Sequence, residues 1–243
     1  MTAAPEVKPV DPPPLDEGRP HVWLLDVRVD DFDALADTGL PSTEDRRRAE
    51  AVSNAAAARG LLARRAAMRL ILAGYRAVRP EEVRVVTAPG GKPVLVPGRG
   101  DADMPLPITF SVCHSGDLYG IAVGSSRSLG LDVERLRHVP RARAIAERWF
   151  GVREADALGQ MPEDELDRAF MRLWTAKEAL AKRHGAGLRL MRGDGDELDV
   201  EAALAEERLR HFEPGAEYTG ALASSEPIEE VVVLNPERMP WTT

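Results

Sequence analysis

Two carboxylates in a short apolar stretch have the residue types and the spacing of a metal site. Asp132 and Glu134 alternate with Leu131 and Val133. This period of two predicts a strand over 129–134 that places both carboxylates on one face, about 7 Å apart. Hard anionic oxygen donors are the ligands that Mg²⁺ prefers. A solvated strand edge would give the same pattern, so the pair alone does not decide between the two.

A second pair of charged residues follows on a predicted helix that begins near Asp167. Its apolar side chains fall within one arc at 3.6 residues per turn, and Lys177 lies in the middle of that arc, where an ammonium needs a charged partner. Glu178 and Lys182, four residues apart, stand at the edge of the arc. One could complete a metal site and the other could hold a phosphate, although a surface ion pair would look the same.

The two stretches together resemble a known signature. The chain reads Gly-Leu-Asp-Val-Glu at 130–134 and Trp-Thr-Ala-Lys-Glu-Ala-Leu-Ala-Lys at 174–182. In this order and at this distance, they resemble the signature of the Sfp-type 4′-phosphopantetheinyl transferases. The resemblance implies transfer of the phosphopantetheine arm of coenzyme A to a serine of an acyl, peptidyl or aryl carrier protein, with release of 3′,5′-ADP. It also implies a role that is most often in secondary metabolism.

The resemblance further assigns roles to the charged residues. Mg²⁺ would be held by Asp132, Glu134 and Glu178, and would bridge the diphosphate of coenzyme A. Lys182 would add a fixed positive charge near the same oxygens. A serine hydroxyl needs a base to take its proton as it attacks, and Glu178 is the candidate, acting directly or through a metal-bound water.

A predicted hairpin over 108–123, with its turn at 115–117, resembles the Phe-Asn-Ile-Ser-His-Ser motif of the same family. Ser111 stands where the motif has Asn, and Cys113 stands where it has Ser. The resemblance makes His114 a catalytic and coenzyme A-binding residue that donates a hydrogen bond to the diphosphate. Cys113 takes the position of a neighbouring ligand, where a thiol donates more weakly than a hydroxyl and a backbone N–H could serve instead.

A basic region precedes this hairpin. Residues 46–79 carry nine arginines and one acid, in a chain whose net charge is −8. An arginine-rich solvated helix would have the same composition, but the resemblance favours Arg46, Arg48 and Arg59 as ligands of the 3′-phosphate of coenzyme A. The turn at 90–93, Gly-Gly-Lys-Pro, is similar to the Gly-Lys-Pro segment of the family, so that Lys92 would reach a phosphate.

The order of predicted elements indicates an α+β fold. An apolar strand is expected at 21–27, and Ser42 with Asp45 offers a helix N-cap. The runs 218–223 and 228–234 form a strand, turn, strand pattern like that of 110–123. We therefore expect a pseudo-dimer of two similar α/β subdomains, 21–127 and 128–243, with the ligand cleft between them.

Composition excludes several other classes of protein. The negative net charge argues against nonspecific binding to nucleic acid. The single cysteine fits a reducing compartment, no apolar run reaches the ~20 residues of a membrane span, and the proline-rich start, 1–20, is expected to be a disordered leader and not a secretory signal. A cytoplasmic protein is expected, and a built-in pseudo-dimer favours a monomer.

Two other functions remain open at this point. A metal-dependent phosphohydrolase would also use carboxylates with Lys and Arg, but it would release product from coenzyme A or a nucleotide without any carrier protein. A noncatalytic coenzyme A-binding module would keep the basic region without needing Asp132, Glu134 and Glu178 together.

Overall fold

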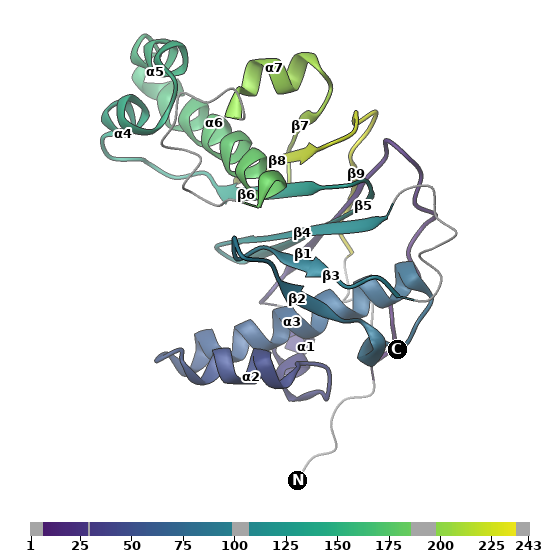
Figure 1. Cartoon of the computed structure of the whole chain (residues 1–243). Coiled ribbons are helices and arrows are strands. Elements are labelled where there is room, and N and C mark those ends of the chain that lie inside the picture. The colour runs from purple at the N-terminus through teal and green to yellow at the C-terminus, as the bar shows by residue number, and fades with distance from the viewer. Residues whose placement is uncertain (1–6, 29, 99–106, 186–197, 237–243) are drawn as a thin grey trace.

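The structure is a computed structural model that describes residues 7–28, 30–98, 107–185 and 198–236. Its helices and strands form four layers, in which two sheets lie face to face and a helical layer covers the outer face of each (Figure 1). The mixture of helices and antiparallel strands confirms the predicted α+β class. None of the described helices combines the length and the apolar character needed to cross a membrane.

The first sheet has the strand order β4-β5-β1-β9. Its strands are β1 (His21–Asp26), β4 (Ile108–Ser115), β5 (Leu118–Ser125) and β9 (Val232–Leu234). The helices of this half are α1 (Asp30–Ala34), η1 (Leu35–Asp37), α2 (Thr43–Glu50), α3 (Ala55–Arg76) and η2 (Pro80–Glu82), and α3 contributes most of the side chains that pack on the outer face of the sheet. The predicted capping box of α2 is confirmed, with Asp45 in the place usually taken by Glu.

The second sheet has the strand order β6-β8-β7. Its strands are β6 (Leu129–Arg135), β7 (Leu209–Phe212) and β8 (Tyr218–Ser224). The helices of this half are α4 (Ala142–Trp149), α5 (Val152–Gly159), α6 (Glu163–His184) and α7 (Val200–Ala205). The buried ammonium of Lys177 has the charged partner that its position requires, since it lies 2.7 Å from a carboxylate oxygen of Glu154 on α5.

An apolar core joins the two sheets. It is formed by side chains from the facing strands of both, including Leu24, Ala122, Leu131, Val133 and Leu222. The edge strands β4 and β6 lie side by side at one rim of this core (Figure 1). A two-stranded hairpin, β2 (Val85–Thr87) and β3 (Pro93–Leu95), stands beside that rim. The rim therefore brings segments from both halves of the chain together.

The C-terminal strands differ from the predicted arrangement. The runs 218–223 and 228–234 were expected to pair as a hairpin, but β9 leaves the second sheet and pairs in parallel with β1 of the first. A strand has only two edges, and both edges of β8 are already occupied, by β6 and β7. The free edge of β1 offers β9 its backbone partners instead. The internal duplication and the boundary between subdomains stay predictions.

The N-terminal segment also differs from the expected disordered leader. Val7, Val10 and Leu15 pack against the core formed by the first sheet and its helices. Val10 is buried and its N–H donates to the carbonyl oxygen of Leu70 on α3. Gly74 makes this contact possible, because a Cβ there would lie 2.2 Å from the carbonyl oxygen of Val10. Prolines remove backbone donors, but they do not prevent a segment from covering a helix.

Candidate functional site

The strand β6 places its residues on two faces, as its sequence predicts. Leu129, Leu131 and Val133 face the first sheet, and Asp132 points toward α6. The helix can come close because the facing positions are small. A Cβ at Gly130 would lie 1.9 Å from the carbonyl oxygen of Ala179, so only glycine is compatible with this contact.

Asp132 and Lys182 meet at the junction of β6 and α6. The Lys182 Nζ lies 2.7 Å from Oδ1 of Asp132, and the two side chains are 29% and 7% exposed. Burial of Lys182 favours the neutral amine, but the charge of Asp132 outweighs this effect and raises the pKa of Lys182. The two halves of the sequence signature therefore form one partly buried ion pair.

Asp132 is not fully satisfied by this pair. Its second oxygen, Oδ2, is buried and has no hydrogen-bond partner among the described residues. Burial raises the pKa of the Asp132 carboxyl to about 7, against the attraction of Lys182. The raised pKa of Lys182 favours a charged ammonium, whereas the raised pKa of Asp132 favours a neutral carboxyl, so the two shifts disagree on whether the pair is ionic. The 2.7 Å contact supports the ion pair, and the unpartnered oxygen accounts for the remaining cost of charging Asp132.

Glu134 and Glu178 lie close enough to influence this pair electrostatically. Both carboxylates oppose the ionisation of Asp132. Burial raises the pKa of Glu178, and the charge of Glu134 adds to this effect, while Lys182 opposes it. Glu134 accepts a hydrogen bond of 2.5 Å from Oγ of Ser115 on β4. Asp132, Glu134 and Glu178 thus act on one another and on Lys182, so that the acids near this ammonium outnumber it.

These carboxylates do not form a closed metal cage as they stand. In the part of the chain that the structure describes, no group of three or more His, Cys, Asp or Glu side chains is arranged to hold a metal ion. Lys182 occupies one oxygen of Asp132, and Ser115 occupies one of Glu134. The unpartnered Oδ2 of Asp132 and the excess of negative charge nevertheless fit a divalent cation, provided that the side chains turn toward it.

Two serines of β4 cover the open edge of β6. Oγ of Ser111 accepts a hydrogen bond from the Leu131 N–H, and Oγ of Ser115 accepts one from the Arg135 N–H. Ser111 therefore keeps a side-chain oxygen acceptor at the position where the family motif has Asn. The sequence showed Ser115 only as part of a turn, and its contacts with β6 depend on a pairing of halves that spacing does not reveal.

His114 and Cys113 lie on opposite faces of β4. His114 is exposed, and its pKa is lowered first by partial loss of hydration and then by the cations of Arg64 and Lys182. Cys113 is 5% exposed in the core between the sheets, where burial raises the pKa of its thiol to about 12. The thiol does not reach the surface, which leaves the backbone of Cys113 as its ligand group.

Lys92 reaches the same junction from the turn of the β2–β3 hairpin. Its ammonium donates to the carbonyl oxygen of Leu129 at 2.7 Å and to that of Arg183 at 3.2 Å. Burial lowers the pKa of Lys92 to about 8. A hollow of about 200 Å³ lies between the hairpin, β4 and the end of α6, and Lys92, Lys182 and Ser111 line it.

The predicted arginines have different surroundings. Arg59 is held by Asp33 and Asp37, and Arg46 donates to the carbonyl oxygen of Thr38. Arg48 pairs with Glu44 and also lines a second hollow, of about 350 Å³, between α2, α3 and β2. Arg65 and Arg69, which were not among the predicted ligands, line the same hollow, together with the apolar side chains of Met68, Val85 and Val86.

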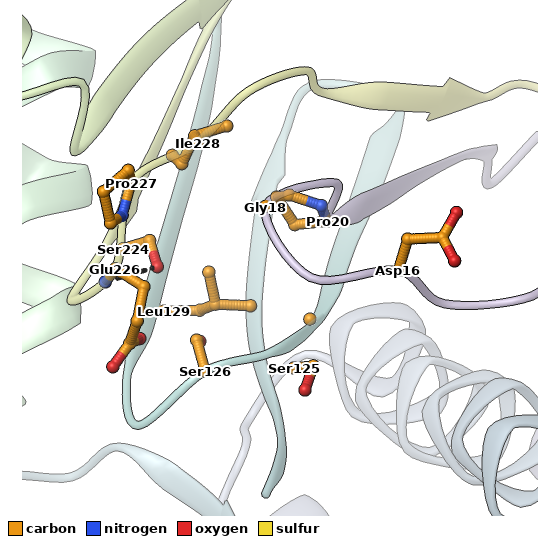
Figure 2. Close-up of a pocket in the computed structure, with 11 residues that line it drawn as sticks. Asp16, Gly18, Pro20, Ser125, Ser126, Leu129, Ser224, Glu226, Pro227 and Ile228 are labelled. Carbon is orange, nitrogen blue, oxygen red and sulfur yellow. Dashed lines mark hydrogen bonds between the residues drawn. The ribbon is translucent and has the colours of Figure 1, made fainter. Parts of the chain in front are cut away.

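A third cavity marks the seam between the halves and contains none of the predicted site residues. It has a volume of only about 10 Å³ and is lined by the chain around Gly18, by Ser126 and Leu129, and by Ser224 and Ile228 (Figure 2). The backbone N–H of Glu226 donates to Oγ of Ser224 at its edge. This space suits at most one water molecule, so it is a joint in the packing and not a ligand site.

The geometry at β6 and α6 agrees with comparisons to known families. Residues 128–219 match the model of the 4′-phosphopantetheinyl transferase superfamily. This part of the chain is therefore similar to that superfamily, and the resemblance predicted from the two stretches is confirmed at the level of the superfamily. The matched segment contains Asp132, Glu134, Glu178 and Lys182.

Individual relatives carry the same name. The chain is 35% identical over 130 residues to the 4′-phosphopantetheinyl transferase HetI of Nostoc sp., covering 54% of this chain and 53% of HetI. It is 28% identical over 173 residues to the putative 4′-phosphopantetheinyl transferase slr0495 of Synechocystis sp., covering 70% and 66%. It is 33% identical over 109 residues to the 4′-phosphopantetheinyl transferase Sfp of Bacillus subtilis, covering 45% and 44%. The matches thus span about half to two thirds of these relatives.

Proposed function

We propose that the protein transfers the 4′-phosphopantetheine arm of coenzyme A to a serine of an acyl, peptidyl or aryl carrier protein. The observation that carries the proposal is the partly buried pair of Lys182 and Asp132, which joins the two signature stretches and leaves one Asp132 oxygen without a partner among the described residues. The superfamily match over the same residues supports it. A cytoplasmic monomer without nucleic-acid ligands is part of the proposal.

In this reaction the serine Oγ forms a bond to the β-phosphorus of coenzyme A, and the bond from that phosphorus to the bridging diphosphate oxygen breaks. The electron pair leaves with 3′,5′-ADP. The serine proton passes to Glu178, whose raised pKa suits a base that must hold a proton near neutral pH. Lys182 and His114 donate hydrogen bonds to the diphosphate oxygens as negative charge moves toward the leaving group.

The residues present fit Mg²⁺, which would be held by Asp132, Glu134 and Glu178. When bound, the ion supplies positive charge that stabilises the leaving phosphate. Asp132 is buried on the α6 side of β6, so that water competes little for its carboxylate and its attraction for a cation is stronger. Lys182 would then turn from Asp132 toward the diphosphate.

The hollow lined by Arg48, Arg65 and Arg69 is the proposed place for the 3′-phosphoadenosine end of coenzyme A. Its guanidinium groups, which pair with Glu44 and Asp45 in the same hollow, could turn to a phosphate, and the side chains of Met68 and Val86 offer an apolar wall for a base. Arg46 and Arg59 would contribute less, since neither lines this hollow and Arg59 is held by two carboxylates, Asp33 and Asp37.

The test is intact-mass spectrometry of an apo carrier protein incubated with this protein, coenzyme A and Mg²⁺. A gain of one phosphopantetheine that is lost with EDTA and in Asp132→Ala is expected. Breakdown of coenzyme A without any carrier would instead favour a phosphohydrolase. Binding of coenzyme A without transfer to acyl, peptidyl and aryl carriers would favour a noncatalytic binding module.

A further inference from the structure

Lys92 connects two backbone atoms of the C-terminal half from a hairpin of the N-terminal half. Its ammonium donates to the carbonyl oxygen of Leu129, the first residue of β6, and to that of Arg183, in the last turn of α6. The stem of Lys92 also covers Gly185, where a Cβ would lie 3.6 Å from the lysine Cδ. One side chain therefore contacts both elements of the site at once.

Both carbonyl groups need a partner from outside their own element. Leu129 lies on β6, which is an edge strand and has no strand beyond it in its sheet. The last four carbonyl groups of a helix have no partner within the helix, and Arg183 is one of these. A positive charge is favourable at this end, because it lies against the negative end of the helix dipole.

The contact lies beside the closest approach of β6 and α6. Gly130 follows Leu129, and a Cβ on it would lie 2.4 Å from the backbone nitrogen of Arg183. Lys182 precedes Arg183 and pairs with Asp132 across this junction. A small separation of the two backbones would therefore change the distance between these charged groups directly.

We infer that Lys92 is a positioning residue, whose ammonium holds the start of β6 against the end of α6 and so sets the geometry of Asp132 and Lys182. This differs from the role of a phosphate ligand, because an ammonium that binds a phosphate would have to leave one or both carbonyl oxygens. Ser111 and Ser115 also bind β6, since their Oγ atoms accept hydrogen bonds from the N–H groups of Leu131 and Arg135. The edge of β6 is thus held by three side chains from the N-terminal half.

The activity readout of this inference rests on the proposed function, so the experiment begins with the protein free of coenzyme A. Hydrogen exchange of the backbone amides at 182–185 is compared between the wild type and Lys92→Met, which keeps the stem and removes the donors. Exchange should become about tenfold faster in the variant, since a charge-assisted hydrogen bond is lost. Lys8→Met, at an exposed lysine, should leave it unchanged.

Activity is then measured where the wild type transfers phosphopantetheine. In Lys92→Met, kcat should fall roughly tenfold or more while KM for coenzyme A stays within about threefold, because the catalytic geometry and not the ligand contact is lost. Lys92→Arg keeps both donors and a charge, and should restore the exchange rates at least in part. It also serves as the second variant if Lys92→Met does not fold.

Unchanged exchange at 182–185, combined with a tenfold weaker affinity for coenzyme A, would show that Lys92 is a phosphate ligand and would overturn the inference. If Lys92→Met does not fold, unchanged exchange and weakened coenzyme A binding in Lys92→Arg would overturn it equally. A wild-type protein that transfers no phosphopantetheine would contradict the proposed function alone, because the hydrogen-exchange measurement still decides the role of Lys92.

Discussion

The ammonium of Lys182 lies 2.7 Å from a carboxylate oxygen of Asp132, across 50 positions of sequence. Removing two charges from water costs several kcal/mol per ion, and their mutual attraction seldom exceeds that cost by much. The pair is therefore a poor device for stability alone. The second carboxylate oxygen of Asp132 has no partner among the described residues. The negative charges of Glu134 and Glu178 also oppose the ionisation of this carboxyl. The arrangement is poised to accept another cation.

The first prediction concerns the pH dependence of stability without metal. Because burial raises the pKa of Asp132 to about 7, the folded protein completes the ion pair with Lys182 only as pH rises toward that value, whereas an unfolded chain releases the Asp132 proton near pH 4. The folded state therefore binds more protons in this window and loses stability as pH rises through it. Asp132→Asn has no such proton to lose. Its free energy of unfolding, relative to that of the wild type, should therefore increase by about 2 to 3 kcal/mol as the pH rises from 5 to 8.

Urea unfolding in EDTA at several pH values measures this difference directly. Comparison with the variant removes the contribution of histidines such as His211, whose pKa is lowered to about 4 by burial and which titrates with the opposite effect on stability. Added Mg²⁺ should flatten the wild-type curve, because a bound cation favours the ionised carboxylate. Parallel curves for wild type and variant would show that Asp132 is already ionised below pH 5.

The second prediction separates the base from the rest of the site. Glu178→Gln keeps the shape of the side chain but cannot accept a proton, so turnover should fall by about 10² to 10⁴. Coenzyme A should still bind within a few-fold of the wild-type affinity. Single-turnover transfer to a carrier protein and calorimetric binding of coenzyme A provide the two measurements. Turnover near the wild-type rate would rule out Glu178 as the base.

The third prediction concerns the contact that brings the charged groups together. Gly130→Ala places a methyl group 1.9 Å from the carbonyl oxygen of Ala179, so α6 must move away from β6. We expect a loss of about 1 to 3 kcal/mol in stability and a loss of most activity. Thermal unfolding and carrier modification measure both effects. Gly159→Ala is the matched control, since nothing lies within 4 Å of a Cβ there, and it should unfold at or above the wild-type temperature.

Local pattern was sufficient to predict the elements that carry the site. The alternation of Leu131, Asp132 and Val133 gave β6 and its two faces, and the apolar arc around Lys177 gave α6. These features depend only on residues close in sequence. The need of Lys177 for a charged partner was also visible, although the sequence could not say that Glu154 supplies it.

Contacts between distant segments were beyond the reach of local pattern. The role of Gly130 depends on how closely α6 approaches, and the two carbonyl partners of Lys92 depend on the docking of the hairpin. The pairing of β9 with β1 follows from which strand edges remain free once β8 is paired on both sides. Periodicity gives the face of an element but not the identity of its neighbour.

The last prediction ranks the arginines by their surroundings. Arg48 lines the hollow between α2, α3 and β2 and pairs with one carboxylate, Glu44, whereas Arg59 is held by two, Asp33 and Asp37. Arg48→Ala should therefore weaken coenzyme A binding by about tenfold, corresponding to about 1.4 kcal/mol, and Arg59→Ala should weaken it less. The loss in Arg48→Ala should be small for dephospho-coenzyme A, because that ligand lacks the 3′-phosphate. Arg79→Ala, at an exposed arginine paired with Glu82, is the control for a change of net charge. Equal losses for the two ligands in Arg48→Ala would place the 3′-phosphate away from this hollow.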